Sequence, residues 1–378
     1  MKPFVFSCDA HIVEPLNLFT AGMPDHLKQW APNACMDEAG MRLNRLGETV
    51  LFKIPGNFHT HRVGEADDLD TRRLGARDLR KRLVDMKRDG VDAELCFPSL
   101  GLLVCRITDA EAVRTATRLY NDWAWDYLDG LRNKLVPAAL IPTVNMEDAL
   151  AELEYVIQKG YRAVTLPISN VDSMPKYNDP VWDPFVARCA QAGIPLCFHT
   201  GVGQMTLRAL KGPGGALYNY TRQMNDAVDV IAQMVGGGVL DRHPSAHILF
   251  AECGAGWLYG LAERMDEVYY GHAPAISPKL SRMPSDIVRA QVHCAMQNDT
   301  GALSTIPGLT TANFLFATDY PHSEGTFPRS MQVVEQARAA NPGLTEEQWA
   351  AVLGGNASRL FGISREVVDR ETTAAMAA

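Results

Sequence analysis

Features that would define several other classes of protein are missing from this sequence. Its cysteines form no CxxC pair, so neither a disulfide framework nor a zinc knuckle is indicated. The net charge of -8 is accompanied by no basic stripe, so nucleic acid is not an expected partner. No apolar run has the length of a transmembrane helix or of a signal peptide, so a membrane is not an expected partner either. A cytoplasmic protein is therefore predicted.

What the sequence does have is a large supply of apolar residues, 47% against 21% charged, which is enough for a sizeable core. They gather in eight short runs with helix-like segments between them. Continuous apolar strands that alternate with helices indicate a parallel sheet covered on both faces. We therefore predict an α/β fold, a (β/α)8 TIM barrel. An open doubly wound sheet is the alternative, but no GxGxxG motif follows the first run. The runs span 4–11, 91–99, 135–143, 163–168, 195–201, 247–253, 289–296 and 314–322.

Two segments are longer than a minimal barrel needs. Residues 16–75 follow the first strand and contain MRLNRLGETVLFKIPG, whose alternation predicts a hairpin. Residues 202–240 follow the fifth strand and are rich in Gly, Asn and Met. Because barrel active sites are built at the carboxyl ends of the strands, both insertions are expected to cover the mouth of the site. The whole chain, 1–378, is then a single barrel domain.

Side chains that bind metals stand where several predicted strands end. Asp9 and His11 end the first strand, and their i, i+2 spacing places both on one face. His199 ends the fifth strand and Asp319 follows the eighth. Alone, His199 could be a hydrogen-bonded core histidine and Asp319 a helix N-cap. Together, two imidazoles and two carboxylates match a site for Zn²⁺, Mn²⁺ or Fe²⁺.

Four motifs of this sequence stand at or near the ends of predicted strands. They are DAHIVEP (9–15), CFHTG (197–201), HPSAHILFAECGAGWL (243–258) and FATDYPHSEGTFP (316–328). Together they resemble the amidohydrolase-related branch of the amidohydrolase superfamily, which includes aminocarboxymuconate-semialdehyde decarboxylase and aromatic-acid decarboxylases. The resemblance implies a (β/α)8 barrel that binds a divalent metal (Zn, Mn or Fe) through Asp9, His11, His199 and Asp319. It also implies a hydrolase or carboxy-lyase, a small-molecule substrate and a homo-oligomer.

Two departures from the family pattern leave the reaction open. Decarboxylases of this branch carry a catalytic His at the end of strand six, where this chain has Glu252, and strand four lacks the lysine of binuclear amidohydrolases. Our first hypothesis is a mononuclear metal enzyme that hydrolyses or non-oxidatively decarboxylates a small carboxylated or cyclic substrate. Asp319 or Glu252 would move the proton.

The second hypothesis is a dinuclear iron or manganese–iron oxygenase that hydroxylates a C–H bond. Glu14, Glu252 and His322 would then hold the second metal ion. The third hypothesis is a non-catalytic partner subunit.

Substrate carboxylates require a cationic partner. Arg62, Arg106 and Arg208 lie near the predicted mouth and are the candidates. A further H-x-H pair, His59 and His61, lies in the first insertion, where a surface or substrate-lid role is expected.

Overall fold

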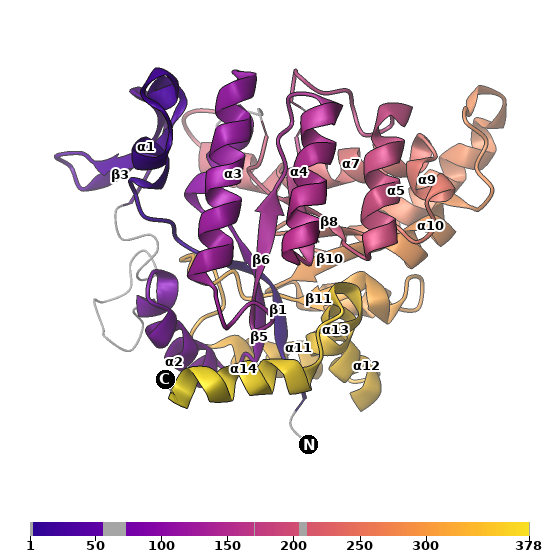
Figure 1. The fold of residues 1–378 in the computed structure, drawn as a ribbon. Helices are drawn as coiled ribbons and strands as arrows, with labels where there is room; N and C mark the ends of the chain where they lie inside the picture. The colour runs from indigo at the N-terminus through magenta and orange to yellow at the C-terminus, as the bar shows by residue number, and fades with distance from the viewer. Residues whose placement is uncertain (1–2, 56–72, 170, 204–209, 378) are drawn as a thin grey trace.

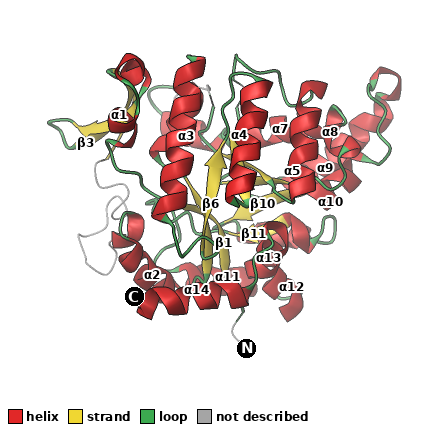
Figure 2. Ribbon diagram, in the orientation of Figure 1, coloured by secondary structure: helices red, strands yellow, loops and turns green. Residues whose placement is uncertain are grey.

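The computed structural model describes residues 3–55, 73–169, 171–203 and 210–377. Eight strands form one sheet in sequential order, and every neighbouring pair is parallel. The predicted (β/α)8 barrel is confirmed, with strands inside and helices around them (Figures 1 and 2). The strands are β1 (Phe6–His11), β5 (Ala93–Phe97), β6 (Leu135–Leu140), β7 (Ala163–Pro167), β8 (Leu196–His199), β9 (Ile248–Ala251), β10 (Val292–Met296) and β11 (Phe314–Phe316).

The barrel closes between β1 and the chain that follows β11. Ala10 and Tyr320 form an isolated parallel bridge. The His11 N–H donates to the Tyr320 carbonyl at 2.6 Å, and the Asp319 N–H donates to the Asp9 carbonyl at 2.8 Å. The backbone bonds that close the barrel therefore involve three of the predicted metal ligands.

Helices connect the strands and cover the barrel. Most connections contain an α-helix, whereas residues 297–313, between β10 and β11, form only the 3-10 turns η6 (Thr300–Thr305) and η7 (Thr311–Asn313). The α-helices are α1 (Leu18–Gly22), α2 (Leu79–Asp89), α3 (Ala110–Tyr127), α4 (Met146–Lys159), α5 (Asp183–Ala192), α6 (Gly215–Thr221), α7 (Met224–Gly236), α8 (Val239–Arg242), α9 (Leu258–Gly271), α10 (Pro284–Gln291), α11 (Ser330–Ala340), α12 (Glu346–Ala350), α13 (Asn356–Phe361) and α14 (Arg365–Ala377). The remaining turns are η1 (Asp25–Trp30), η2 (Leu74–Ala76), η3 (Leu100–Arg106), η4 (Pro180–Trp182) and η5 (Ala273–Ala275), with the π-turn η8 (Ala351–Gly355).

Local sequence signals set the ends of the outer helices. The Asp78 side chain accepts hydrogen bonds from the first turn of α2, and Asn145 does the same for α4. Both helices end at a glycine in the left-handed region, Gly90 at φ 81° and Gly160 at φ 101°, a conformation that glycine adopts without strain. None of the helices in the described ranges combines the length and the hydropathy needed to cross a membrane.

The segment after β1 contains the predicted hairpin. It consists of β3 (Met41–Leu46) and β4 (Thr49–Pro55), and β2 (Pro32–Met36), which was not predicted, adds a third antiparallel strand. In Figure 1 this small sheet lies at the upper left, level with the upper ends of the covering helices, whereas α14 crosses the lower end of the barrel.

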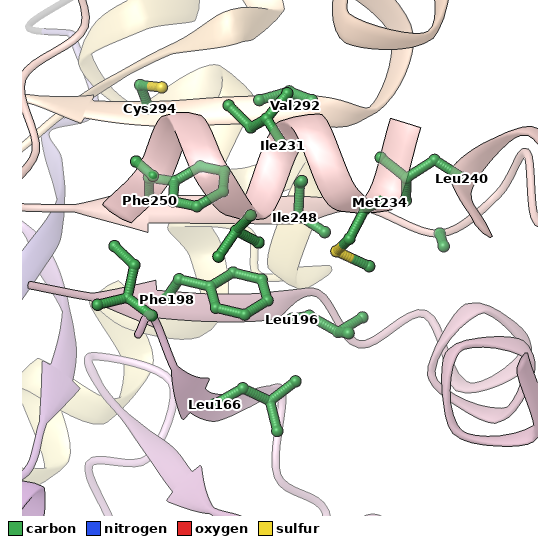
Figure 3. Close-up of a cluster of buried hydrophobic side chains, with 14 of the residues drawn as sticks. Leu166, Leu196, Phe198, Ile231, Met234, Leu240, Ile248, Phe250, Val292 and Cys294 are labelled. Atoms are coloured by element: carbon green, nitrogen blue, oxygen red, sulfur yellow. The ribbon is translucent and has the colours of Figure 1, made fainter. Parts of the chain in front are cut away.

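Strand alternation determines which side chains reach the interior of the barrel. Phe198 and Phe250 point outward from β8 and β9, with stacked rings 5.3 Å apart, and pack beneath Ile231 and Met234 of α7 (Figure 3). A second cluster draws apolar side chains from all eight strands, Cys197 among them, and fills the interior. Because His199 shares a face with Cys197, its ring lies at the top of that interior.

Candidate metal centre

Ligand-type atoms from β1, β8 and the segment after β11 meet at the carboxyl end of the barrel. The Nε2 atom of His11 lies 3.1 Å from His199 Nε2 and 3.5 Å from Asp319 Oδ1. The Nε2 atom of His199 lies 3.5 Å from Asp9 Oδ1. All four side chains are buried. The structure thus brings together the four residues that the sequence singled out.

Backbone carbonyls fix which nitrogen of each imidazole is available. His11 Nδ1 lies 2.8 Å from the Pro98 carbonyl oxygen, and His199 Nδ1 lies 2.7 Å from the Thr200 carbonyl oxygen. A carbonyl only accepts, so both Nδ1–H groups donate and each neutral ring presents an Nε2 lone pair. Two lone pairs 3.1 Å apart repel each other unless a proton or a cation lies between them. Burial opposes protonation of His199, but the carboxylates of Asp9 and Glu252 outweigh it and raise its pKa to about 9.

The two aspartates contribute fully buried carboxylate oxygens to the centre. Asp9 and Asp319 are 0% exposed, and neither oxygen of either carboxylate receives a well-formed hydrogen bond in the described part of the chain. Burial, reinforced by the charge of Asp9, raises the pKa of Asp319. A buried ionised carboxylate is costly unless a cation compensates it. Two imidazole nitrogens with two such carboxylates fit a divalent Zn, Mn or Fe ion.

Two of the strand-end carboxylates stand on strained backbone. Glu252 has φ 58° and Asp319 has φ 55°, and they are the non-glycine residues at positive φ in the described ranges. Such a conformation costs about 1–3 kcal/mol per residue and is found preferentially at functional sites. Residue type is a weak signal of this strain, because Asp adopts the left-handed region more readily than most residues but Glu does not.

A second group of carboxylates adjoins the first. One oxygen each of Glu252, Asp319 and Glu324 lies within 4.8 Å of the others, so Asp319 belongs to both groups. Glu252 Oε2 lies 3.7 Å from His199 Nε2, and His322 Nδ1 lies 2.8 Å from Asp319 Oδ1. Burial and the charge of Asp319 raise the pKa of Glu252, whereas burial lowers the pKa of His322. Sequence reasoning missed Glu324, although it lies in the quoted motif TDYPHSEG.

Glu14 does not join either group in the described part of the chain. Its carboxylate is buried and accepts hydrogen bonds from the backbone N–H groups of Ser99, Leu100 and Gly101 at 2.8–3.2 Å. Because both oxygens are engaged, Glu14 fixes the loop after β5. We therefore remove Glu14 from the second metal set, as a correction to the sequence-based hypothesis.

Of the three arginines predicted to bind substrate, one lies in the described part of the chain. Arg62 and Arg208, together with His59 and His61, lie outside the described residues. Arg106 ends η3 and does not line the pocket beside the metal ligands.

That pocket has a volume of about 520 Å³ and receives side chains from three parts of the chain. The barrel contributes Ser99, Leu102, His199, Thr200, Gly201, Glu252, His322 and Glu324. The hairpin β3–β4 contributes Arg42, Asn44, Phe52, Lys53 and Ile54, and the segment after β8 contributes Leu210, Lys211, Gly212, Gly215, Ala216, Asn219, Tyr220 and Gln223.

Solved structures with a similar fold cover nearly the whole chain. An amidohydrolase from Mycobacterium avium subsp. paratuberculosis K-10 aligns with TM-score 0.80 and 21% identity over 96% of this chain and 100% of its own. The 5-carboxyvanillate decarboxylase LigW from Sphingomonas paucimobilis aligns with TM-score 0.67 and 21% identity over 96% and 100%. A dihydroxybenzoic acid decarboxylase from Polaromonas sp. JS666, with bound manganese and the inhibitor 2-nitroresorcinol, aligns with TM-score 0.62 and 16% identity over 95% and 97%.

At these identities the three structures establish a shared fold. A search of curated proteins found no match. A sequence profile of the family described as amidohydrolase matches residues 8–363, which confirms the resemblance seen in the four motifs. This chain therefore belongs to the amidohydrolase family, a family of metal-dependent enzymes.

Proposed function

We propose that this enzyme uses one divalent metal ion to hydrolyse or non-oxidatively decarboxylate a small carboxylated or cyclic substrate. The observation that carries the proposal is the pair of imidazole Nε2 atoms 3.1 Å apart, flanked by the buried carboxylates of Asp9 and Asp319, which receive no well-formed hydrogen bond from the described residues. His11, His199, Asp9 and Asp319 would hold the ion. When bound, such an ion polarises substrate oxygens and lowers the pKa of water.

The chain's own residues orient the centre and carry the proton. The Pro98 and Thr200 carbonyls accept from the two Nδ1–H groups, which leaves both Nε2 atoms available as the ligands that would hold the ion. The Glu252 carboxyl both lines the pocket and approaches His199 at 3.7 Å, so it can give or take a proton at the substrate. Asp319 is the other candidate for this transfer.

The pocket and the comparisons support a small substrate. A volume of about 520 Å³ suits a single ring with substituents. Two of the enzymes with a similar fold are named as decarboxylases of carboxylated aromatic rings. Because both insertions line this pocket, we infer that residues 16–75 and 202–240 cover its mouth as parts of the same domain.

A second candidate function is favoured by the group formed by Glu252, Asp319 and Glu324. Carboxylates that share Asp319 with the first site are suited to a second ion, as a dinuclear iron or manganese–iron oxygenase requires. A non-catalytic partner subunit has less support, because the complete donor set is retained beside a pocket.

Elemental analysis of the purified protein tests the proposal. The native protein should carry one Zn, Mn or Fe per chain, and His199→Ala should lose most of it, because a ligand has been removed. His26→Ala is the matched control, since His26 is exposed and contacts only the exposed Glu111 through its side chain in the described residues. Full metal content in His199→Ala would remove His199 from the ligand set. Two redox metals per chain, with one lost in Glu324→Gln, would favour the oxygenase.

A further inference from the structure

Two polar side chains occupy the buried face of the hairpin strand β3. Burial alternates along this strand, so that Arg42 and Asn44 share the buried face with Leu46. Arg42 is 7% exposed and Asn44 is 4% exposed. Both line the pocket beside the metal centre. The buried face of a strand usually carries apolar side chains. A guanidinium and an amide on this face are therefore unusual.

Each of these side chains has a buried nitrogen without a hydrogen-bond partner among the described residues. The Nε of Arg42 and the Nδ2 of Asn44 are fully buried and make no hydrogen bond there. Glu14 is the carboxylate that acts on Arg42 electrostatically, but its oxygens are engaged by backbone N–H groups. Burial, with a smaller contribution from Arg77, lowers the pKa of Arg42 to about 10, so the guanidinium remains charged at pH 7. A buried charge without a hydrogen-bonded counter-ion is destabilising, so the Arg42 guanidinium is suited to bind an anionic ligand.

The register of the hairpin places apolar side chains directly opposite these donors. Arg42 pairs with Ile54 and Asn44 pairs with Phe52, and all four line the pocket. Cross-strand partners lie close together on one face of a sheet. This wall of the pocket therefore offers a guanidinium and an amide beside an aromatic ring and an aliphatic side chain.

We propose that Arg42 and Asn44 form the subsite for the substrate's carboxylate, and that an apolar, ring-like part of the same molecule lies against Phe52 and Ile54. The proposal rests on the function proposed above, because it assigns the substrate of that same pocket. A guanidinium and an amide can donate in parallel to a planar carboxylate. Arg42 thus takes the role that the sequence suggested for Arg62, Arg106 or Arg208.

Benzoate and benzamide are suitable probes, because they share a ring and differ in charge. Calorimetric titration of the manganese-loaded protein at low salt should give at least about tenfold tighter binding of benzoate. Arg42→Met should remove this preference and leave benzamide binding unchanged. Arg45→Met is the matched control on the same strand, since Arg45 contacts Glu48 and Cys35 and does not line the pocket.

Urea unfolding separates ligand binding from a structural role. Arg42→Met should be at least as stable as the native protein, because it removes a buried charge that has no hydrogen-bonded counter-ion in the described part of the chain. Native affinity for benzoate in Arg42→Met, or no preference for benzoate in the native protein, would overturn the subsite. A clear loss of stability would overturn it as well. Metal content in Arg42→Met should stay native, so failure of the subsite is distinguishable from failure of the metal assignment in His199→Ala.

Discussion

The ion pair between Arg82 and Glu94 lies beneath the metal centre, and its removal should damage both stability and metal binding. The two side chains are 1% and 2% exposed, and Arg82 Nε donates to Glu94 Oε2 at 2.7 Å. Arg82 also donates from Nη1 to the His11 carbonyl at 2.9 Å, and its guanidinium lies 4.2 Å from the centre of the Tyr320 ring. Arg82 therefore connects α2 to both chain segments that close the barrel.

Replacing Arg82 with Met leaves the Glu94 carboxylate buried without its counter-ion. We expect a loss of about 3–5 kcal/mol in the free energy of unfolding, because removing one partner of a buried ion pair leaves the other charge buried without compensation for its lost hydration. The double variant Arg82→Met/Glu94→Gln should recover at least about 1 kcal/mol of this, by the same reasoning. Arg114→Met removes an ion pair with Asp148 at the surface and should change stability by less than about 1 kcal/mol.

Urea unfolding followed by circular dichroism measures these differences, and elemental analysis measures the metal. Arg82→Met should also bind metal more weakly while folded, because His11 loses the group that holds its carbonyl. A loss below about 1 kcal/mol, or a double variant less stable than the single one, would refute the reasoning.

Two further predictions concern single titratable side chains. Glu252→Gln should slow turnover by about 100-fold or more, because an amide cannot carry a proton. If this slow variant retains one metal ion per chain, the enzyme is mononuclear. If it loses one of two metal ions, the oxygenase is favoured. Normal turnover with unchanged metal content would exclude both roles for Glu252. Burial, with His247 beside it, lowers the pKa of His293 to about 4, and its Nδ1–H donates to the Ala312 carbonyl. As pH falls, the His293 imidazole is protonated at a higher pH in the unfolded chain than in the folded protein. The free energy of unfolding should therefore decrease as pH drops from about 6.5 to 4, by up to about 3 kcal/mol. His293→Gln should flatten the unfolding free energy measured over this range, and an unchanged slope would contradict the assignment.

The sequence by itself determined the barrel and which four candidate metal ligands come together in it. Apolar runs such as AVTLPI and PLCFHTG can only be buried on both faces, and eight of them with intervening helices leave few alternatives to a closed parallel sheet. Their carboxyl ends must then meet around one axis. For that reason Asp9, His11, His199 and Asp319 could be grouped, although most of the chain separates the first of them from the last.

Only the tertiary structure decided how the remaining polar residues are used. The charged residues near strand ends or in an insertion include Glu14, Glu324 and Arg42. The residue type alone does not tell whether such a side chain supports a loop, binds a metal or binds a substrate. Their surroundings depend on residues distant in the chain. Glu14 accepts from three backbone N–H groups after β5, and Glu324 lies beside Asp319 and Glu252, whereas the buried Nε of Arg42 has no hydrogen-bond partner among the described residues. The left-handed backbone of Glu252 and Asp319 is likewise imposed by packing around the barrel mouth. Local sequence sets which faces are buried, but the balance of charge and hydrogen bonding at a site depends on which segments the fold brings within about 3–4 Å of one another.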